Sequence, residues 1–166
     1  MSAQDAAISG FHHVAYRCRD SEATRKFYED FLGMEFANAF EIGRTATGRE
    51  ANVLHSFYRL GDGSFLAFFE APDSPFEFKE QHDFDLHVAM EVTPERLDAT
   101  LAKARAAGME ARGPSDHGII RSIYLRDPNG YVVELTAKTE RHDREMNPAT
   151  NNARATLDAW TKRKAA

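Results

Sequence analysis

The sequence predicts an α+β protein built from two copies of one βαβββ module, and three observations lead to this. The segment His-Val-Ala occurs twice, beginning at His13 and at His87. Each copy is followed by a helical pattern that ends in Gly-Met-Glu, at Gly33 and at Gly108. Both halves then continue into a tyrosine-containing strand, a glycine turn and another strand. An internal repeat of this kind indicates two copies of one supersecondary unit.

Each short module would leave one apolar face open, so the two must close against each other to bury it. We therefore expect two paired modules that form a cup-shaped, mixed but mostly antiparallel sheet with helices outside. Module one would cover about residues 10–75 and module two about 84–137, within a single domain of residues 1–137. The remaining residues, 138–166, would form a C-terminal tail with a terminal helix at 153–164, anchored by Leu157 and Trp160.

The elements of the first module follow from hydrophobic periodicity. Residues 11–19 alternate between apolar and polar side chains, as a half-buried strand does. Asp20 is a suitable N-cap for the helix that follows, and Gly33 stands where a helix C-cap is expected. Strands are predicted at 52–60 and 65–70, because a Gly-Asp-Gly turn separates two apolar runs.

The second module repeats this order. Residues 86–92 alternate like the first strand, and Pro94 at a first helical position begins a helix that Gly108 ends. Strands at 119–125 and 131–136 are joined by the turn sequence Asp-Pro-Asn-Gly.

Composition excludes several classes of protein. A hydrophobic fraction of 42% and an aromatic fraction of 11% argue against intrinsic disorder. The net charge of −5, without a basic cluster in the patterned region, argues against a nucleic-acid partner. No window approaches the roughly 20 apolar residues of a membrane span. A lone Cys18 and the absence of signal-peptide features lead us to expect a soluble cytoplasmic protein.

A metal site is predicted from the repeat. His13 and His87 occupy equivalent positions, so their imidazoles would face each other across the cup. Glu134 shares a strand face with its neighbours two residues away, in a segment otherwise rich in apolar residues, where an unpaired charge is costly. Two imidazoles and one carboxylate form a facial triad with open positions, the arrangement of non-haem Fe(II) sites. The first module has Ala67 at the equivalent place, and Glu70 falls on the opposite face.

The chain resembles the vicinal oxygen chelate superfamily, which includes glyoxalase I, fosfomycin-resistance proteins and extradiol ring-cleavage dioxygenases. The resemblance covers about residues 10–137. Its general part is the opening His-Val-Ala with Phe27-Tyr28 and Leu32-Gly33. Its more specific part is similar to the extradiol dioxygenase signature and consists of His117, Ile123-Tyr124, Asp127-Pro128-Asn129-Gly130 and Glu134.

The resemblance implies an extradiol-type dioxygenase that cleaves a catechol-like aromatic diol with O₂. The divalent metal at His13, His87 and Glu134 would then be Fe(II), with Mn(II), Zn(II) or Ni(II) as alternatives. His117 would act as acid/base or hydrogen-bond donor, and Tyr124 would bond the substrate oxygen. The alternatives are an exposed loop position for His117 and a core position for Tyr124. Such enzymes usually carry another histidine after the first module's turn, where this chain has Gly-Ser-Phe-Leu.

Three other functions remain open. A glyoxalase I-like lyase or isomerase usually has four protein ligands, and Ala67 argues against a fourth. A fosfomycin-type thiol transferase shares the ligand set, but the sequence has no evident basic pocket for a phosphonate. A non-catalytic protein that binds small molecules is the third possibility. For all of them we expect a small-molecule partner, no nucleic acid, no membrane and a possible homodimer.

Several side chains near the predicted site have less certain places. His12 should point to the helix side by strand alternation, whereas the pattern does not fix the direction of His55. Arg17 lies two residues after His13 and is expected to pair with a carboxylate. An aromatic run is expected in the core, and it consists of Phe65, Phe68, Phe69, Phe76, Phe78 and Phe84.

Overall fold

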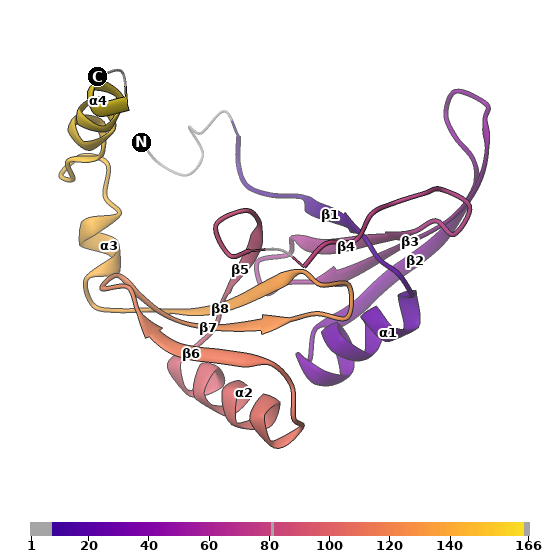
Figure 1. Ribbon diagram of the computed structural model, residues 1–166, viewed down its shortest axis with the longest axis horizontal. Helices are drawn as coiled ribbons and strands as arrows, with labels where there is room; N and C mark the ends of the chain where they lie inside the picture. Colours follow the sequence, from indigo (N-terminus) through magenta and orange to yellow (C-terminus); the bar gives the residue numbers. More distant parts are fainter. Residues whose placement is uncertain (1–7, 81, 165–166) are drawn as a thin grey trace. The chain divides into compact units, whose positions relative to one another are not determined.

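The computed structural model describes residues 8–80 and 82–164 and confirms the α+β class (Figure 1). It contains two four-stranded sheets, with the strand orders β1-β4-β3-β2 and β5-β8-β7-β6. In each sheet the first strand of the module runs parallel to the last one, and the pairs β2–β3, β3–β4 and β6–β7 are antiparallel. Because both sheets have the same order, the two βαβββ copies that the repeat predicts are present.

The helices and strands of the first module are β1 (His13–Arg17), α1 (Ser21–Arg25), η2 (Lys26–Phe31), β2 (Glu35–Arg44), β3 (Glu50–Arg59) and β4 (Phe65–Glu70). Those of the second module are β5 (His87–Glu91), α2 (Pro94–Ala106), β6 (Ala111–Asp116), β7 (Ile120–Arg126) and β8 (Val132–Lys138). The tail contains the short α3 (His142–Glu145) and α4 (Ala153–Lys164), and α4 has the predicted bounds.

Contacts divide the chain into two compact units. The first consists of residues 1–86 together with the turn 126–131, and the second of residues 87–125 and 132–166. The turn that joins β7 to β8 therefore belongs by its contacts to the first unit. In the part of the chain that the structure describes, no helix is long and apolar enough to span a membrane.

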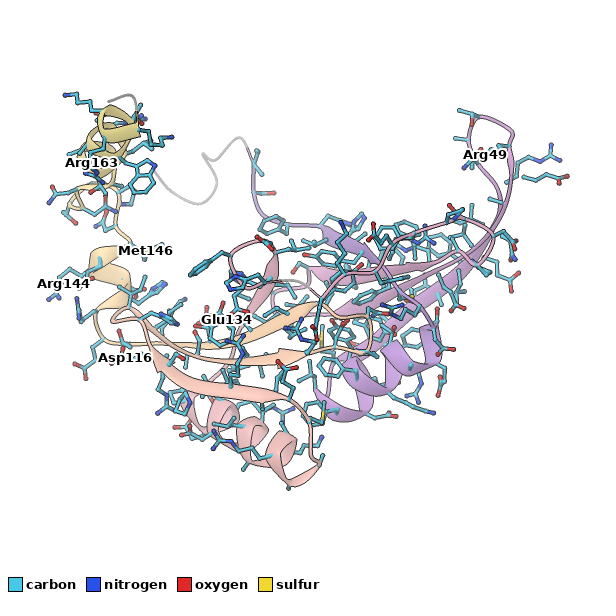
Figure 2. All side chains as sticks on the ribbon, in the orientation of Figure 1. Arg49, Asp116, Glu134, Arg144, Met146 and Arg163 are labelled. Carbon is cyan, nitrogen blue, oxygen red and sulfur yellow. The ribbon has the colours of Figure 1, made fainter. Side chains whose placement is uncertain are left out.

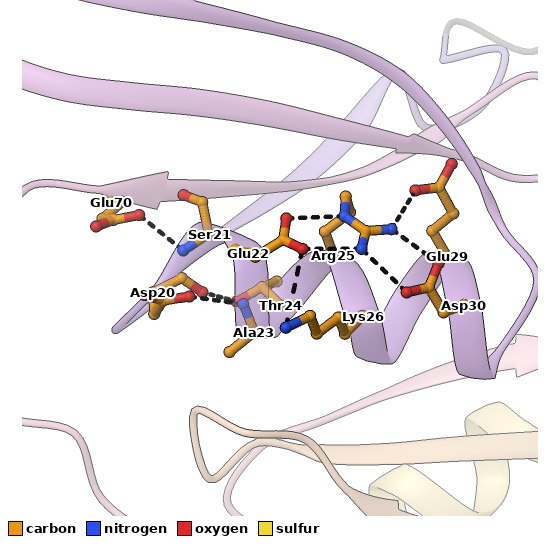
Figure 3. A network of polar contacts seen from close by, with 10 residues as sticks. All are labelled: Asp20, Ser21, Glu22, Ala23, Thr24, Arg25, Lys26, Glu29, Asp30 and Glu70. Carbon is orange, nitrogen blue, oxygen red and sulfur yellow. Dashed lines mark hydrogen bonds and ion pairs between the residues drawn. The ribbon is translucent and has the colours of Figure 1, made fainter.

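The predicted helix at the start of the first unit is an α-helix that widens into a π-helix. Asp20 is its N-cap, and its Oδ1 accepts a hydrogen bond of 2.6 Å from the Ala23 backbone. Arg25 pairs with Glu22 three residues before it and with Glu29 and Asp30 four and five residues after it (Figure 3). The pairing with Asp30 at spacing five matches π-helical geometry. Local ion pairs thus accompany the change in helical pitch.

The core of the first unit is aromatic. Tyr28, Tyr58 and Phe68 are buried, and the ring centroid of Tyr28 lies 4.9 Å from that of Phe68 and 5.5 Å from that of Tyr58. The Tyr28 hydroxyl donates a 3.0 Å hydrogen bond to Asp127 Oδ2. Burial, and then the nearby Asp127 charge, raise the pKa of Tyr28 well above its ordinary value.

The turn 126–131 is fixed by polar bonds to the first unit. Asn129 Oδ1 accepts a hydrogen bond of 2.8 Å from the Arg19 backbone, and Asn129 Nδ2 donates to Thr24 Oγ1 at 3.3 Å. Asp127 Oδ1 also accepts from the backbone N–H groups of Asn129 and Tyr131. Asp127 is buried, which raises its pKa although these bonds oppose the rise.

The second unit has a simpler core between α2 and its sheet. Thr93 caps α2, and its side chain accepts a hydrogen bond of 3.2 Å from the Arg96 backbone. The buried face of α2 carries Leu97, Leu101 and Ala104, and the fully buried sheet residues include Ile123 and Val133. Because Val133 lies on the helix side, its neighbours Val132 and Glu134 face the other way.

Two expectations about apolar side chains are wrong. Phe68 is fully buried, but Phe76 is 47% exposed and Phe84 is 94% exposed, so the aromatic run does not form one core. In α4, Leu157 and Trp160 are each about half exposed, and the helix is not anchored through them. Phe76 and Phe84 lie in the connector between β4 and β5, and α4 lies in the tail after β8, so none of these side chains belongs to either sheet.

Candidate functional site

The second sheet presents its polar side chains on the face away from α2. The register of the parallel pair places His87 beside Val132 and Ala89 beside Glu134, so their side chains share a face. Ser122 Oγ lies 3.2 Å from Thr136 Oγ1, which puts alternate residues of β7 on the same face. We call this surface the second inner face.

His87 and Glu134 meet on the second inner face. Their Nε2 and Oε2 atoms are 3.1 Å apart, and the Glu134 side chain is only 5% exposed whereas that of His87 is 40% exposed. Glu134 is labelled in Figure 2. Among the described residues, His87 is the one polar partner of the Glu134 carboxylate. A buried carboxylate with one imidazole beside it is a costly arrangement unless further positive charge reaches it.

His117 and Tyr124 form a second pair on this face. Their Nε2 and Oη atoms are 2.9 Å apart. The turn bond from Asp127 N to Tyr131 O and the Ser122–Thr136 contact set a hairpin register in which Tyr124 lies opposite Glu134. His117 is exposed and precedes β7, as its loop alternative predicts, but its ring is engaged by Tyr124. Tyr124 is half-buried rather than a core residue.

The first sheet has the same strand register as the second, with different side chains at the equivalent positions. His13 pairs with Phe65 and Ala15 with Ala67, in the register that His87 and β8 show in the second sheet. Ala67 is therefore the structural counterpart of Glu134, as the repeat predicts. The carboxylate of Glu70 lies on the helix side, where Oε2 accepts a hydrogen bond of 2.7 Å from the Ser21 backbone (Figure 3).

His13 lies among rings on what we call the first inner face. Its ring centroid is 5.7 Å from that of Phe57 and 6.2 Å from that of His55. His12 does not point to the helix side: its Nδ1 lies 2.8 Å from His13 Nδ1, and its ring contacts Phe65. The expectation fails because β1 begins at His13, so strand alternation does not extend to His12.

The structure settles the direction of His55, which pairs with Phe69 and faces inward. His55 is 6% exposed, and its Nδ1 lies 3.0 Å from the Phe68 carbonyl oxygen. Its ring stacks on Phe69 with centroids 3.7 Å apart and an interplanar angle of 13°. Burial lowers the pKa of His55, and the neighbouring His13 adds to the lowering while the carbonyl opposes it.

Arg17 has a structural role in the first unit. Its Nη2 donates hydrogen bonds of 2.9 Å to the carbonyl oxygens of Ala71 and Ser74, so it ties the connector to β1 rather than pairing with a carboxylate. Arg17 and Phe69 also line a cavity of about 750 Å³ in the first unit, with Ile42 and Val53 on its apolar side.

The predicted site residues thus fall into three local groups. The structure brings His87 together with Glu134 and His117 together with Tyr124, and it places His13 beside His55. Neither unit by itself, among its described residues, gathers three His, Cys, Asp or Glu side chains that could hold a metal ion.

The comparisons with known proteins agree with this fold. The family model of the Glyoxalase/Bleomycin resistance protein/Dioxygenase superfamily matches residues 10–135. The chain belongs to this superfamily. A curated relative, a probable lactoylglutathione lyase of Vibrio parahaemolyticus, is 28% identical over 129 residues, which cover 74% of this chain and 86% of the relative.

Solved structures share the fold at lower identity. A glyoxalase/dioxygenase from Nostoc punctiforme is 24% identical with a TM-score of 0.59 and covers 79% of this chain and 92% of its own. A glyoxalase/bleomycin resistance protein/dioxygenase domain from Frankia is 18% identical with a TM-score of 0.63, covering 83% and 99%. The FosX fosfomycin resistance protein of Listeria monocytogenes, solved with Mn(II) and sulfate, is 22% identical with a TM-score of 0.58, covering 82% and 98%.

Proposed function

We propose that the protein is a metal-dependent enzyme of the extradiol dioxygenase type, which cleaves a catechol-like aromatic with O₂. In this proposal His13, His87 and Glu134 hold one divalent metal, most suitably Fe(II). His117 and Tyr124 handle the protons of the substrate. The observation that carries the proposal is the His117–Tyr124 pair, because it shares the inner face of the second sheet with the predicted ligands His87 and Glu134.

The donor set fits a divalent cation. Glu134 is buried with a single imidazole 3.1 Å away, and a cation bound there would compensate the burial of its charge. Imidazole and carboxylate donors suit Fe(II), Mn(II) and Zn(II) alike, so the ligand types do not select one metal. His13 is the repeat counterpart of His87 and would supply the third donor from the first unit.

The chain's own residues would then position the substrate and move its protons. The bound metal would supply Lewis acidity and a path for electrons between the diol and O₂. Tyr124 Oη, 2.9 Å from His117 Nε2, can donate to or accept from a substrate oxygen while His117 relays the proton. Since His117 is exposed, its second nitrogen can exchange that proton with solvent.

The test begins with protein purified without oxygen and reconstituted with Fe(II). We expect about one metal per chain by elemental analysis, and O₂ uptake with a yellow ring-opened product when a panel of catechols is supplied. His87→Ala should lose the metal, because one of the three donors is gone. Full metal occupancy in that variant would contradict the triad.

A second variant tests the proton-handling pair. Tyr124→Phe should retain the metal but lower the rate of ring opening by about 10²-fold or more, the usual contribution of a positioned acid or base. Tyr131→Phe is the matched control, because Tyr131 belongs to the turn 126–131 of the first unit and its ring lies 5.2 Å from that of Tyr16. An unchanged rate in Tyr124→Phe, with metal retained, would remove Tyr124 from the site.

A lactoylglutathione lyase-type isomerisation is the second candidate, favoured by the name of the curated relative. Such a reaction needs a carboxylate base near the substrate carbon. In the first unit the counterpart of Glu134 is Ala67, and Glu70 caps a helix instead. Isomerisation of the hemithioacetal of methylglyoxal and glutathione by the zinc- or nickel-loaded protein, without O₂ uptake, would favour this candidate over ring cleavage.

A further inference from the structure

His55 is a buried imidazole on the first inner face to which the proposed function gives no role. Three phenylalanine rings surround it: Phe69 is stacked at 3.7 Å between centroids, Phe57 lies at 4.2 Å and Phe40 at 5.4 Å. A histidine in such an apolar surrounding loses hydration, and its polar atoms need partners.

The hydrogen bond to Phe68 fixes the tautomer of His55. A carbonyl oxygen can only accept, so Nδ1 carries the proton and donates across the 3.0 Å contact. Nε2 of the neutral ring then keeps its lone pair and is an acceptor. Among the described residues Nδ1 is the only His55 atom with a hydrogen-bond partner. Nε2 of His55 is therefore an oriented hydrogen-bond acceptor among aromatic rings, with no hydrogen-bond partner among the described residues.

The acceptor lies close to the proposed ligand His13. Both side chains occupy the first inner face, and their ring centroids are 6.2 Å apart. On this face Ala15, Ala67 and Phe57 form the row of the sheet between them. The two alanines have one-carbon side chains, and the Phe57 ring lies 5.7 Å from that of His13 and 4.2 Å from that of His55. Phe69, whose ring stacks on His55, also lines the cavity of about 750 Å³ together with Ile42 and Val53, and this cavity offers space for a ring substituent.

We propose that His55 is a substrate-contacting residue, whose Nε2 accepts a hydrogen bond from a hydroxyl of a substituted aromatic substrate. The rings of Phe40, Phe57 and Phe69 would contact the apolar part of that substrate. This inference rests on the proposed function, because the metal held by His13 would bring the substrate oxygens to the first inner face. Its direct consequence is that His55 controls substrate affinity and not metal binding.

The experiment measures anaerobic binding of 4-nitrocatechol, a coloured probe, to Fe(II)-loaded protein. His55→Asn retains an amide N–H near the position of Nδ1 but has no acceptor near that of Nε2. His55→Gln places an amide oxygen near the Nε2 position. His142→Asn, a histidine change on α3, is the control. We expect a ten- to hundredfold loss of affinity in His55→Asn and partial recovery in His55→Gln, the size of one buried hydrogen bond.

Metal content and melting temperature are measured for every variant. Weakened probe binding in His55→Asn at full metal content, with recovery in His55→Gln, supports the proposal. Equal affinity in all variants overturns it and leaves the proposed function intact. Loss of metal in His55→Asn also overturns it, since His55 would then be a ligand. A wild-type protein that binds no metal or no probe overturns the proposed function together with this inference.

Discussion

Two buried tyrosines in the same core differ in what their hydroxyl groups contact. Tyr28 donates to the buried Asp127, whereas the Tyr58 hydroxyl has no hydrogen-bond partner among the described residues. Their rings contact each other and Phe68, so the apolar surroundings are alike. Comparing the two tyrosines therefore distinguishes the stabilisation from a hydrogen-bonded buried hydroxyl from the cost of a buried hydroxyl without a partner.

We expect opposite results when each hydroxyl is removed. Tyr28→Phe should lower the free energy of unfolding by about 1–3 kcal/mol, because Asp127 loses a donor in a buried place. Tyr58→Phe should be neutral or stabilise by up to about 1 kcal/mol at pH 7. Urea unfolding at pH 7 measures both. An equal loss in the two variants would show that the Asp127 bond adds nothing.

At the residue scale, sequence reasoning assigned each proposed metal ligand to a strand face. The faces of His13, His87 and Glu134 can be predicted from the sequence, because the repeat and strand alternation define them without knowledge of which strands pair. The direction of His55 was not accessible, because it depends on the register between β3 and β4. A single-residue slip would turn His55 to the other face.

At the scale of elements, the strands that pattern analysis finds and those it misses differ in regularity. The inner strands β3, β4, β7 and β8 correspond to the runs expected at 52–60, 65–70, 119–125 and 131–136. The strands β2 and β6 are implied by the βαβββ module, but the sequence pattern does not locate them. Register shifts interrupt both, and β6 contains a glycine and a proline. Bulges and edge prolines break the period-two pattern on which strand prediction depends.

The helix start at Asp20 gives an element-level prediction. Asp20→Ala should lower the free energy of unfolding by about 1 kcal/mol, because the Ala23 N–H loses its 2.6 Å acceptor. Asp20→Asn keeps an acceptor oxygen and should lose much less. Thermal and urea unfolding of the two variants make the comparison. If both variants lose the same amount, charge at the helix end matters more than the capping bond.

For the whole molecule, metal binding should couple to stability. A ligand that binds the folded chain adds RT ln(1 + [L]/Kd), about 2.7 kcal/mol when the free metal is 100 times its Kd. We expect a chelator to lower the melting temperature of wild-type protein and metal to restore it. His87→Ala should melt at the same temperature with and without metal. A metal-induced rise in that variant would indicate a site elsewhere.

Alkaline pH should weaken the fold of the whole molecule. Burial raises the pKa of Tyr58 and of Tyr131 to about 12, above the ordinary value of 10.0. The protonated form of each tyrosine therefore contributes its full stabilisation below pH 10 and loses it as the pH rises towards 12. The loss in the free energy of unfolding is at most roughly 2–3 kcal/mol for a shift of two pKa units. Between pH 8 and 12, the free energy of unfolding should fall less steeply with pH for Tyr58→Phe than for wild type. Parallel curves would contradict this assignment.

The turn 126–131 makes the two copies of the module unequal. The first unit takes Asp127 and Asn129 from the hairpin of the second repeat, where they bond Tyr28 and Arg19. Its own hairpin offers Leu60 at the position of Asp127, since Leu60 N bonds Ser64 O as Asp127 N bonds Tyr131 O. The two copies of the module are thus unlike halves. A tandem of two first repeats would leave Tyr28 without its carboxylate, so the order of the copies can no longer be exchanged.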